Sequence, residues 1–265
     1  MEENDLIIEK REQIATLSFN RPQKRNALSL DLLIQIYQAL EEFSKSEEIR
    51  VVIFRGTGDE SFSSGFDISA IPTKASQKVM EAMKTQNPLD MTLQAIKNFQ
   101  YPTIALLNGY AYGAGLNLCM CCDLRIAADD IRMSMPPAKL GVVYHDTGIQ
   151  QFIEVLGLGK AKEVFLTART YRGDELISSG LVDYLLPKGE LESFTYEYAQ
   201  KIGNNAPMAL KGMKRIINMF GSNIALNEMQ KKEAEELVRV SFQSDDLKEG
   251  QTAFLEKRSP VFKGK

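Results

Sequence analysis

The stretch "NGYAYGAGLNLCMCCDLRIAA" (residues 108–128) predicts a glycine-rich turn that leads from a buried strand directly into a helix. Backbone N–H groups at the start of a helix have no partner within it, and the helix dipole makes that end positive. Such a turn therefore suits an oxygen that carries negative charge. The first polar side chain after the glycines is that of Asn117, and an amide cannot act as a general base.

A second glycine loop, "SFSSGFDISAI" (residues 61–71), places small residues at a similar point between a strand and a helix. Two backbone donors from separate loops can hold one oxygen between them, an oxyanion hole in which each donor contributes roughly 3–4 kcal/mol. Two ordinary turns would contain the same glycines, so the spacing alone leaves both interpretations open. A dinucleotide-binding fingerprint is disfavoured, because the third glycine of G-x-G-x-x-G is absent.

Composition is typical of a soluble globular protein. The chain has 265 residues, of which 44% are hydrophobic and 25% charged, with a net charge of −3 and a sequence pI near 5.5. It is long enough to bury a sizeable core, and it lacks the basic stripe of a nucleic-acid binder. No apolar run is long enough to span a bilayer, and the acidic start "MEENDLIIEK" has no signal-peptide pattern. We therefore expect a cytoplasmic protein without nucleic-acid or membrane partners.

The order of patterns along the chain predicts an α/β fold. Residues 6–20 alternate like a hairpin, and strand, glycine-bearing loop and helix then recur. Either Ser29 or Asp31 is expected to cap the first long helix. A further helix is expected over residues 74–99, with an interruption near Asn87.

Helical patterns dominate from about residue 189 onward. We therefore divide the chain into a core, residues 1–188, and a C-terminal helical segment, residues 189–265. A segment of this kind either covers an active site, packs on a partner subunit or simply caps the core.

All three cysteines, Cys119, Cys121 and Cys122, lie within one predicted helix. Neighbouring cysteines on a helix cannot pair at normal disulfide geometry, and no second Cys or His cluster completes a zinc site. We expect no metal, and we interpret the cysteines as small apolar side chains in a buried helix.

Five motifs, in order along nearly the whole chain, resemble the crotonase (enoyl-CoA hydratase/isomerase) superfamily. They are "RPQKRNALS" (21–29), "FSSGFDI" (62–68), residues 108–128, "PPAKLGVVY" (136–144) and "EGQTAFLEKRSPVFKGK" (249–265). The resemblance implies a crotonase-type spiral of β-β-α units, a homotrimer or a dimer of trimers, and an acyl-CoA thioester substrate. It implies no separate cofactor, because coenzyme A is part of the substrate.

The resemblance also assigns site residues. The backbone amides of Phe66 and Ala114, with Gly113 beside them, would hold the thioester oxygen while it becomes an enolate. The CoA channel would be lined by Lys24, Arg25, Ala27, Leu28, Ser64, Asp67 and Ile68. Lys24 and Arg25 are cations that can meet CoA phosphates, although a solvated charged loop is an equal alternative.

Two departures from the superfamily pattern bear on the reaction. Its hydratases use two glutamates to activate water, and the matching positions here are Asn117 and Pro137. Neither residue can take up a proton at neutral pH. Ordinary hydration of a 2-enoyl-CoA and glutamate-mediated isomerisation are therefore disfavoured.

The next loop, "GVVYHD" (residues 141–146), concentrates groups that handle protons. Tyr144, the only histidine His145, and Asp146 follow one another. In an extended stretch Tyr144 and Asp146 would share one face, with His145 on the other. The alternatives are an aromatic pocket wall for Tyr144, a surface or supporting histidine for His145, and a helix N-cap for Asp146.

This loop resembles that of the methylmalonyl-CoA decarboxylases, a branch of the same superfamily in which a tyrosine lies by the leaving carboxylate. Those enzymes have a histidine at the position of Phe66, which here offers only its backbone amide and a ring. Loss of CO₂ from a malonyl-type thioester forms the enolate without a base, so it suits a site that lacks both glutamates. Asn117 would orient the carboxylate or a water, and Tyr144 or His145 would deliver the proton.

We therefore expect a lyase-type acyl-CoA enzyme, with decarboxylation as the first candidate. The alternatives are an isomerase or hydratase acting on an unusual enoyl- or dienoyl-CoA, with Asp146 or His145 as the base, an acyl-CoA hydrolase, and a non-catalytic acyl-CoA binder. Residues 71–91 should form part of the acyl pocket wall. Their Met80, Met83 and Met91 indicate an adaptable apolar lining or plain core packing.

Overall fold

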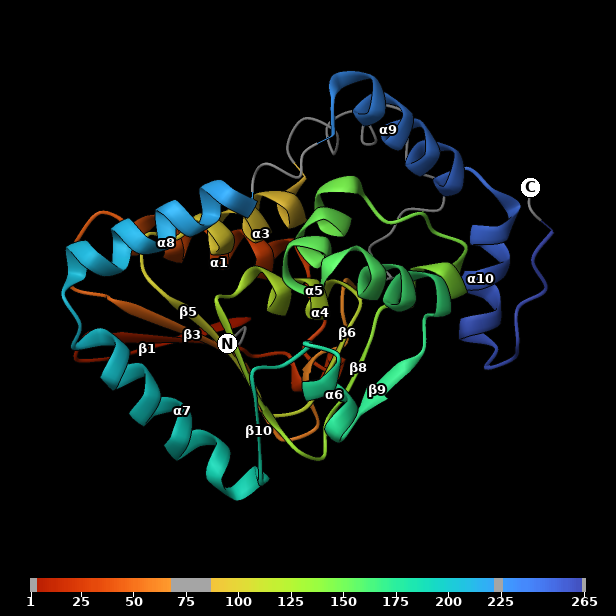
Figure 1. Ribbon diagram of the computed structural model, residues 1–265. Coiled ribbons are helices and arrows are strands. Elements are labelled where there is room, and N and C mark those ends of the chain that lie inside the picture. The colour runs from red at the N-terminus through yellow and green to blue at the C-terminus, as the bar shows by residue number, and fades with distance from the viewer. Residues whose placement is uncertain (1–3, 68–86, 222–225, 264–265) are drawn as a thin grey trace.

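The computed structural model describes residues 4–67, 87–221 and 226–263, and its strands form two sheets (Figure 1). In the large sheet β1 and β2 are antiparallel, and every other neighbouring pair is parallel. Its strands, in spatial order, are β1 (Leu6–Arg11), β2 (Ile14–Phe19), β3 (Val51–Gly56), β5 (Thr103–Leu107), β7 (Leu124–Ala128) and β10 (Tyr184–Leu186). The hairpin predicted over residues 6–20 is confirmed as β1 and β2.

The small sheet is formed by short strands, three of which follow a strand of the large sheet, while the fourth follows α5. In spatial order they are β4 (Ser61–Ser63), β6 (Tyr110–Tyr112), β8 (Arg132–Ser134) and β9 (Thr170–Arg172). The chain runs from β5 to β6 and into α4 (Ala114–Cys121), and then from β7 to β8 and into α5 (Asp146–Thr167). This repetition confirms the predicted spiral of β-β-α units.

Helices cover both faces of the large sheet. Besides α4 and α5, the described helices are α1 (Leu30–Phe43), α3 (Pro88–Asn98), α6 (Asp174–Ser178), α7 (Lys188–Gly203), α8 (Pro207–Gly221), α9 (Glu228–Phe242) and α10 (Asp245–Leu255). Two short 3-10 turns are η1 (Pro22–Lys24) and η3 (Pro137–Leu140). Figure 1 shows α1 and α3 above the strands and α7 below them. In these described ranges no helix combines the length and the apolar character needed to cross a membrane.

Local sequence explains these elements. The inner strand β2 is buried along its whole length, as a parallel strand covered on both faces should be. In α1 the Ser29 hydroxyl accepts a hydrogen bond from Leu32 N, so Ser29 rather than Asp31 is the cap. Helix α3 begins with Asn87 as its cap and Pro88 in its first turn. The part of the predicted helix before Asn87 lies outside the described residues.

Helix α4 lies in the core, and every one of its residues is buried. Its three cysteines are buried with it, so the prediction of apolar filling is confirmed. Burial raises the pKa of all three thiols, that of Cys122 to about 12. These cysteines therefore carry no thiolate at neutral pH.

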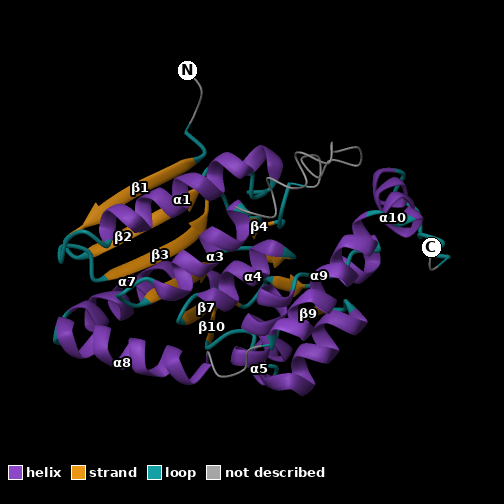
Figure 2. Cartoon of the chain, turned by 90° about the horizontal axis from the view of Figure 1, so that it is seen from above, coloured by secondary structure: helices purple, strands orange, loops and turns teal. Residues whose placement is uncertain are grey.

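The C-terminal helices make different contacts with the core. Helix α7 packs on β2, β3, β5 and β7, although the division at residue 188 assigned it to the appended segment. Helix α8 is anchored by the buried Lys214, whose ammonium donates to Tyr101 O at 2.9 Å and to the Asp123 carboxylate at 2.6 Å. Helices α9 and α10 lie away from the large sheet (Figure 2), where α9 packs on α5 and α10 packs on η3.

One buried side chain connects the first polar loop to the small sheet. Asn26 is fully buried and has the positive φ (53°) that asparagine tolerates. Its amide donates to the carbonyls of Thr57 and Ser61, at 2.9 and 2.8 Å. Beside it, Leu28 N donates to Gly65 O at 2.8 Å. The loop of residues 21–28 is therefore fixed against the turn that contains Gly65.

We expect Asn26→Ala to lower the free energy of unfolding by about 2–3 kcal/mol, because two buried carbonyls lose their donor. Urea denaturation followed by far-UV circular dichroism measures this change. Gln23→Ala, on the exposed side of the same loop, is the matched control and should change stability by less than about 0.5 kcal/mol. Equal effects of the two substitutions would contradict this role for Asn26.

Candidate active site

Two backbone amides, those of Phe66 and Ala114, follow glycines with positive φ. The φ angles are 98° at Gly65 and 53° at Gly113, values that favour glycine. A Cβ on Gly65 would lie 2.7 Å from Tyr112 O and 3.3 Å from Ala114 N. The two loops therefore touch, and the absence of a side chain at Gly65 permits their approach.

Neither amide donates to another backbone group in the described part of the chain. Ala114 is the first residue of α4, where N–H groups have no partner within the helix. Phe66 and Ala114 both line one cavity of about 260 Å³, as do Gly65 and Gly113. Two free donors beside one cavity are the arrangement that an oxyanion hole requires.

The lining of this acyl cavity, as we name it, is largely apolar. Apart from the two loops, its described lining consists of Ser64, Asn87, Leu89, Met135, Pro136, Pro137, Leu140, Val142, Val143, Tyr144, His145, Val238 and Phe242. None of these residues is a carboxylate, and Tyr144 and His145 are the ones that titrate. Helix α9 contributes Val238 and Phe242, so the C-terminal segment closes one side of the cavity of its own chain.

The two positions that hold glutamates in hydratases have different surroundings here. Pro137 lines the acyl cavity, whereas Asn117 is fully buried and is absent from its described lining. The Asn117 amide donates to Gln151 Oε1 at 2.6 Å, and its oxygen accepts from the Tyr144 hydroxyl at 2.9 Å. The structure thus places Asn117 behind Tyr144, rather than against a substrate carboxylate or water.

Tyr144 lies between the acyl cavity and the core. Its ring centroid is 4.4 Å from that of His145 and 5.6 Å from that of Phe165. Burial raises the pKa of the Tyr144 hydroxyl well above its usual value, and the nearby Cys121 and Asp90 add to this shift. The phenol therefore keeps its proton at neutral pH and remains a hydrogen-bond donor.

His145 is the N-cap of α5, so the interpretation of Asp146 as the cap was wrong. Its Nδ1 lies 3.1 Å from the N–H of Gly148, and Asp146 is the first residue of the helix. Asp146 is also absent from the described lining of the acyl cavity. Tyr144 and Asp146 were predicted to share one face of an extended stretch. The chain is not extended there, because α5 begins at Asp146 with His145 as its cap.

Sequence reasoning missed Asp90, which lies beside His145. Asp90 Oδ1 is 3.0 Å from Nδ1 of His145 and accepts from the Thr147 hydroxyl at 3.2 Å. Burial lowers the pKa of His145, while the carboxylates of Asp90 and Asp146 oppose the shift. In sequence Asp90 is only an acidic residue in the first turn of a helix, so no signal links it to residue 145.

The structure spreads the predicted CoA-channel residues over several environments. Lys24 and Arg25 are exposed, while Ala27 and Leu28 are buried, with Leu28 in the hydrophobic core. Asp67 forms an ion pair with Arg21 at 3.3 Å. Ile68 lies outside the described residues, as do Met80 and Met83.

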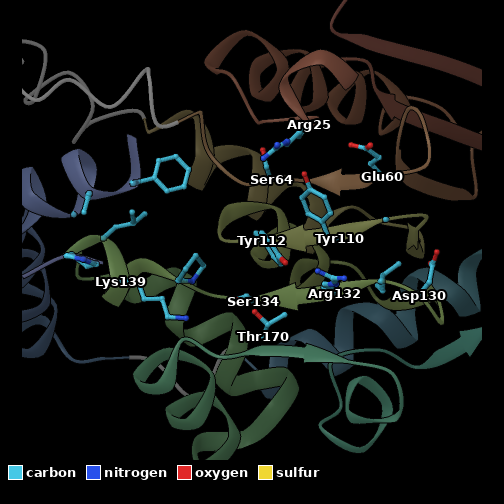
Figure 3. Close-up of a pocket in the computed structure, with 18 of the residues that line it drawn as sticks. Arg25, Glu60, Ser64, Tyr110, Tyr112, Asp130, Arg132, Ser134, Lys139 and Thr170 are labelled. Carbon is cyan, nitrogen blue, oxygen red and sulfur yellow. The ribbon is translucent and has the colours of Figure 1, made fainter. Parts of the chain in front are cut away.

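A second, larger cavity of about 990 Å³ adjoins the acyl cavity and shares Ser64, Pro136 and Leu140 with it. Figure 3 shows Arg25 beside Ser64, Lys139 across the cavity from them, and Arg132 toward the acidic end that holds Asp130. Tyr110 and Tyr112 lie between, with their rings 4.9 Å apart. We call this space the polar cavity.

Comparison with known families, sequences and structures finds relatives that act on acyl-CoA thioesters. Residues 9–265 match the family described as enoyl-CoA hydratase/isomerase. The short-chain-enoyl-CoA hydratase of Clostridium acetobutylicum is 33% identical over 97% of each chain, and the methylmalonyl-CoA decarboxylase of Escherichia coli is 31% identical over 95% of each. A solved methylmalonyl-CoA decarboxylase complexed with 2S-carboxypropyl CoA superposes with a TM-score of 0.91 at 30% identity, covering 100% of both chains.

The match to the family covers almost the whole chain, and the spiral of β-β-α units agrees with it. Relatives above 30% identity include both hydratases and a decarboxylase, so the family is shared while the reactions differ. This chain belongs to the enoyl-CoA hydratase/isomerase family and is a crotonase-fold enzyme that processes acyl-CoA thioesters.

Proposed function

We propose that this enzyme decarboxylates a malonyl-type acyl-CoA thioester through a thioester enolate. The observation that carries the proposal is the acyl cavity, which has two free backbone donors and no carboxylate in its described lining. Hydration and isomerisation each need a group that removes or activates a proton at the start. Decarboxylation needs none, because the departing CO₂ leaves its electron pair on the substrate.

The reaction would proceed as follows. The thioester oxygen lies between the N–H groups of Phe66 and Ala114, and the bond from the α-carbon to the carboxylate carbon breaks. The electron pair moves through the α-carbon onto that oxygen, where the two N–H groups stabilise the negative charge. The apolar lining solvates a carboxylate less well than CO₂, which favours the loss. The α-carbon then takes up one proton.

The size of the acyl cavity favours a short acyl group. A volume of about 260 Å³ lies just below the usual range for ligand pockets, which begins at about 300 Å³. Phe66 and Phe242 line it together with valines and prolines, so its described lining is mainly apolar. A methylmalonyl group is of suitable size and carries the carboxylate that the reaction expels.

Hydration of an enoyl-CoA is the second candidate, and His145 is the observation that favours it. Its imidazole lines the acyl cavity. Burial lowers its pKa below the usual value, although Asp90 and Asp146 oppose this shift. A neutral imidazole is a base of suitable strength for activating water. Hydratases are also among the relatives at 33% identity.

The polar cavity is the proposed site for the coenzyme A portion. It meets the acyl cavity at Ser64, which would place the thioester at the junction of the two spaces. In the described residues Arg25 and Lys139 form no ion pair, so both cations are available for phosphate oxygens. Tyr110 and Tyr112 offer aromatic surface on which the nucleobase of coenzyme A can stack.

We also propose a homotrimer or a dimer of trimers, supported by apolar residues exposed on the C-terminal helices. The most exposed of them are Met208, Ile217, Phe220, Met229, Leu255 and Phe254. Three of them lie on α8, and exposed apolar surface on one helix marks interaction sites in soluble proteins.

Incubation with methylmalonyl-CoA should yield propionyl-CoA, detected by mass spectrometry, with crotonyl-CoA as the parallel substrate. Tyr144→Phe should lower the rate about tenfold, because loss of the hydrogen bond to Asn117 frees the ring that packs on His145 at the cavity wall. Tyr184→Phe is the control, since that hydroxyl pairs with Tyr198 at 3.0 Å away from the cavity lining. Hydrated crotonyl-CoA without propionyl-CoA would replace the proposal by the hydratase; hydrolysis products or binding without turnover would indicate a hydrolase or a non-catalytic binder.

Arg25→Ala and Lys139→Ala should each raise KM about tenfold with kcat nearly unchanged, because phosphate contacts bind ground state and transition state equally. Steady-state kinetics with the CoA thioester measures this. Arg132→Ala changes a cation of the same cavity near its acidic end and should have a smaller effect. A larger rise in KM for Arg132→Ala would place the phosphates elsewhere.

Sedimentation equilibrium should give a mass of three or six times 29.7 kDa. Ile217→Glu together with Phe220→Glu should shift the distribution toward smaller species, because two charges would be buried at the interface. Lys232→Glu, on the exposed surface of α9, controls for charge alone. A monomer at micromolar concentration would rule out the trimer.

A further inference from the structure

We infer that His145 and Asp90 form a dyad in which Asp90 positions the imidazole and Nε2 of His145 exchanges a proton with the α-carbon of the substrate. The inference rests on the proposed enolate chemistry and deepens it. It assigns the proton to one atom and adds Asp90, a residue of α3, as a positioning residue.

The first observation is an unsatisfied atom. Nε2 of His145 is buried and has no hydrogen-bond partner among the residues that the structure describes, although its residue lines the acyl cavity. Buried polar atoms without partners are rare and costly, because their interaction with water is lost without replacement. Because His145 lines the acyl cavity, a substrate in that cavity would contact this side chain.

The second observation is the crowding around the other ring nitrogen. Nδ1 lies 3.0 Å from Asp90 Oδ1, 2.8 Å from Thr147 Oγ1 and 3.1 Å from Gly148 N. One ring nitrogen carries either a proton or a lone pair, so it cannot accept from Gly148 and donate to Asp90 at once. The neutral tautomer with a bare Nδ1 therefore caps α5. In the imidazolium, and in the neutral tautomer that is protonated at Nδ1, Asp90 holds the Nδ1 proton.

Nδ1 has a partner whether it is bare or protonated, namely Gly148 N–H or the Asp90 carboxylate, so the ring stays in place while its charge changes. In the imidazolium, Nδ1–H donates to Asp90 and Nε2–H remains free for the enolate. When Nε2 gives its proton to the α-carbon, a new C–H bond forms, and neutral imidazole remains with its proton on Nδ1. Solvent then returns one proton, so each turnover converts a malonyl-type thioester and one proton into CO₂ and the shortened thioester.

Tyr144 is the less suitable donor. Its hydroxyl already donates to Asn117 Oδ1 at 2.9 Å, and Asn117 is held in turn by Gln151. Donation to the substrate would leave a buried carbonyl oxygen without its partner. In the described residues the titratable groups that face the imidazole are Asp90 from α3, Asp146 from α5 and the phenol of Tyr144.

His145 is the only histidine of the chain, so a ¹³C-histidine label gives one ring signal whose pH titration is read directly. Asp90→Asn should lower the pKa of His145, because a carboxylate that favours the imidazolium is removed. Asp146→Asn is the matched control, with the same charge change on a residue that does not contact Nδ1. Its shift should be smaller, and equal shifts in the two variants would overturn the dyad.

The second readout is exchange of the α-protons of propionyl-CoA in D₂O, which tests proton transfer without decarboxylation. His145→Gln should slow the exchange about 100-fold, and Asp90→Asn should slow it about tenfold and move its pH profile to lower pH with the histidine pKa. Unchanged exchange in His145→Gln would overturn the assignment. If the dyad titrates and exchanges as expected but methylmalonyl-CoA is not decarboxylated, only the proposed function fails.

Discussion

The close approach of two glycine turns is the constraint on which the site depends. Gly65 lies so near Tyr112 O that a Cβ would be 2.7 Å from it, and both Gly65 and Gly113 have positive φ. The amides that follow, those of Phe66 and Ala114, have no backbone partner within the residues that the structure describes. An alanine at Gly65 would be strained in φ and would also push the two loops apart.

The rest of the fold holds these turns in position. The small sheet pairs β4 with β6 in parallel, so the two strands deliver their glycines to the same edge. Asn26 ties the first polar loop to β4, and the buried helix α4 fixes the second turn from below. Because α4 is buried on every side, its position cannot adjust to a substrate without disturbing the core. The positions of the Phe66 and Ala114 amides are therefore preorganised by packing.

Much of this arrangement is predictable from the sequence, since hydrophobic runs, glycines and caps are local signals. The spiral, the hairpin of β1 and β2, the cap at Ser29 and the buried cysteines all follow from such patterns. Contacts between segments that are far apart in the sequence leave no such local signal. Predictions about these contacts were wrong or could not be made. His145 rather than Asp146 caps α5, and Asp90, 55 positions earlier in the chain, reaches the imidazole. Only the packing of α3 beside α5 brings those two residues together.

The buried polar groups of the site also explain why it lost its carboxylates without losing its order. A glutamate at position 117 would point a charge at Tyr144 and Gln151 in a buried environment, where an unpaired carboxylate is expensive. The asparagine instead donates to Gln151 and accepts from Tyr144, so it satisfies both neighbours without charge. In the described part of the chain, three polar atoms of residues that line the acyl cavity lack a partner: the amide nitrogens of Phe66 and Ala114, and Nε2 of His145. An enolate needs two N–H donors to stabilise its oxygen as it forms. It then needs one group, here a ring nitrogen, to transfer a proton to its α-carbon. A site reduced to that set has no base with which to begin a hydration, unless the imidazole that quenches the enolate is used for that step instead.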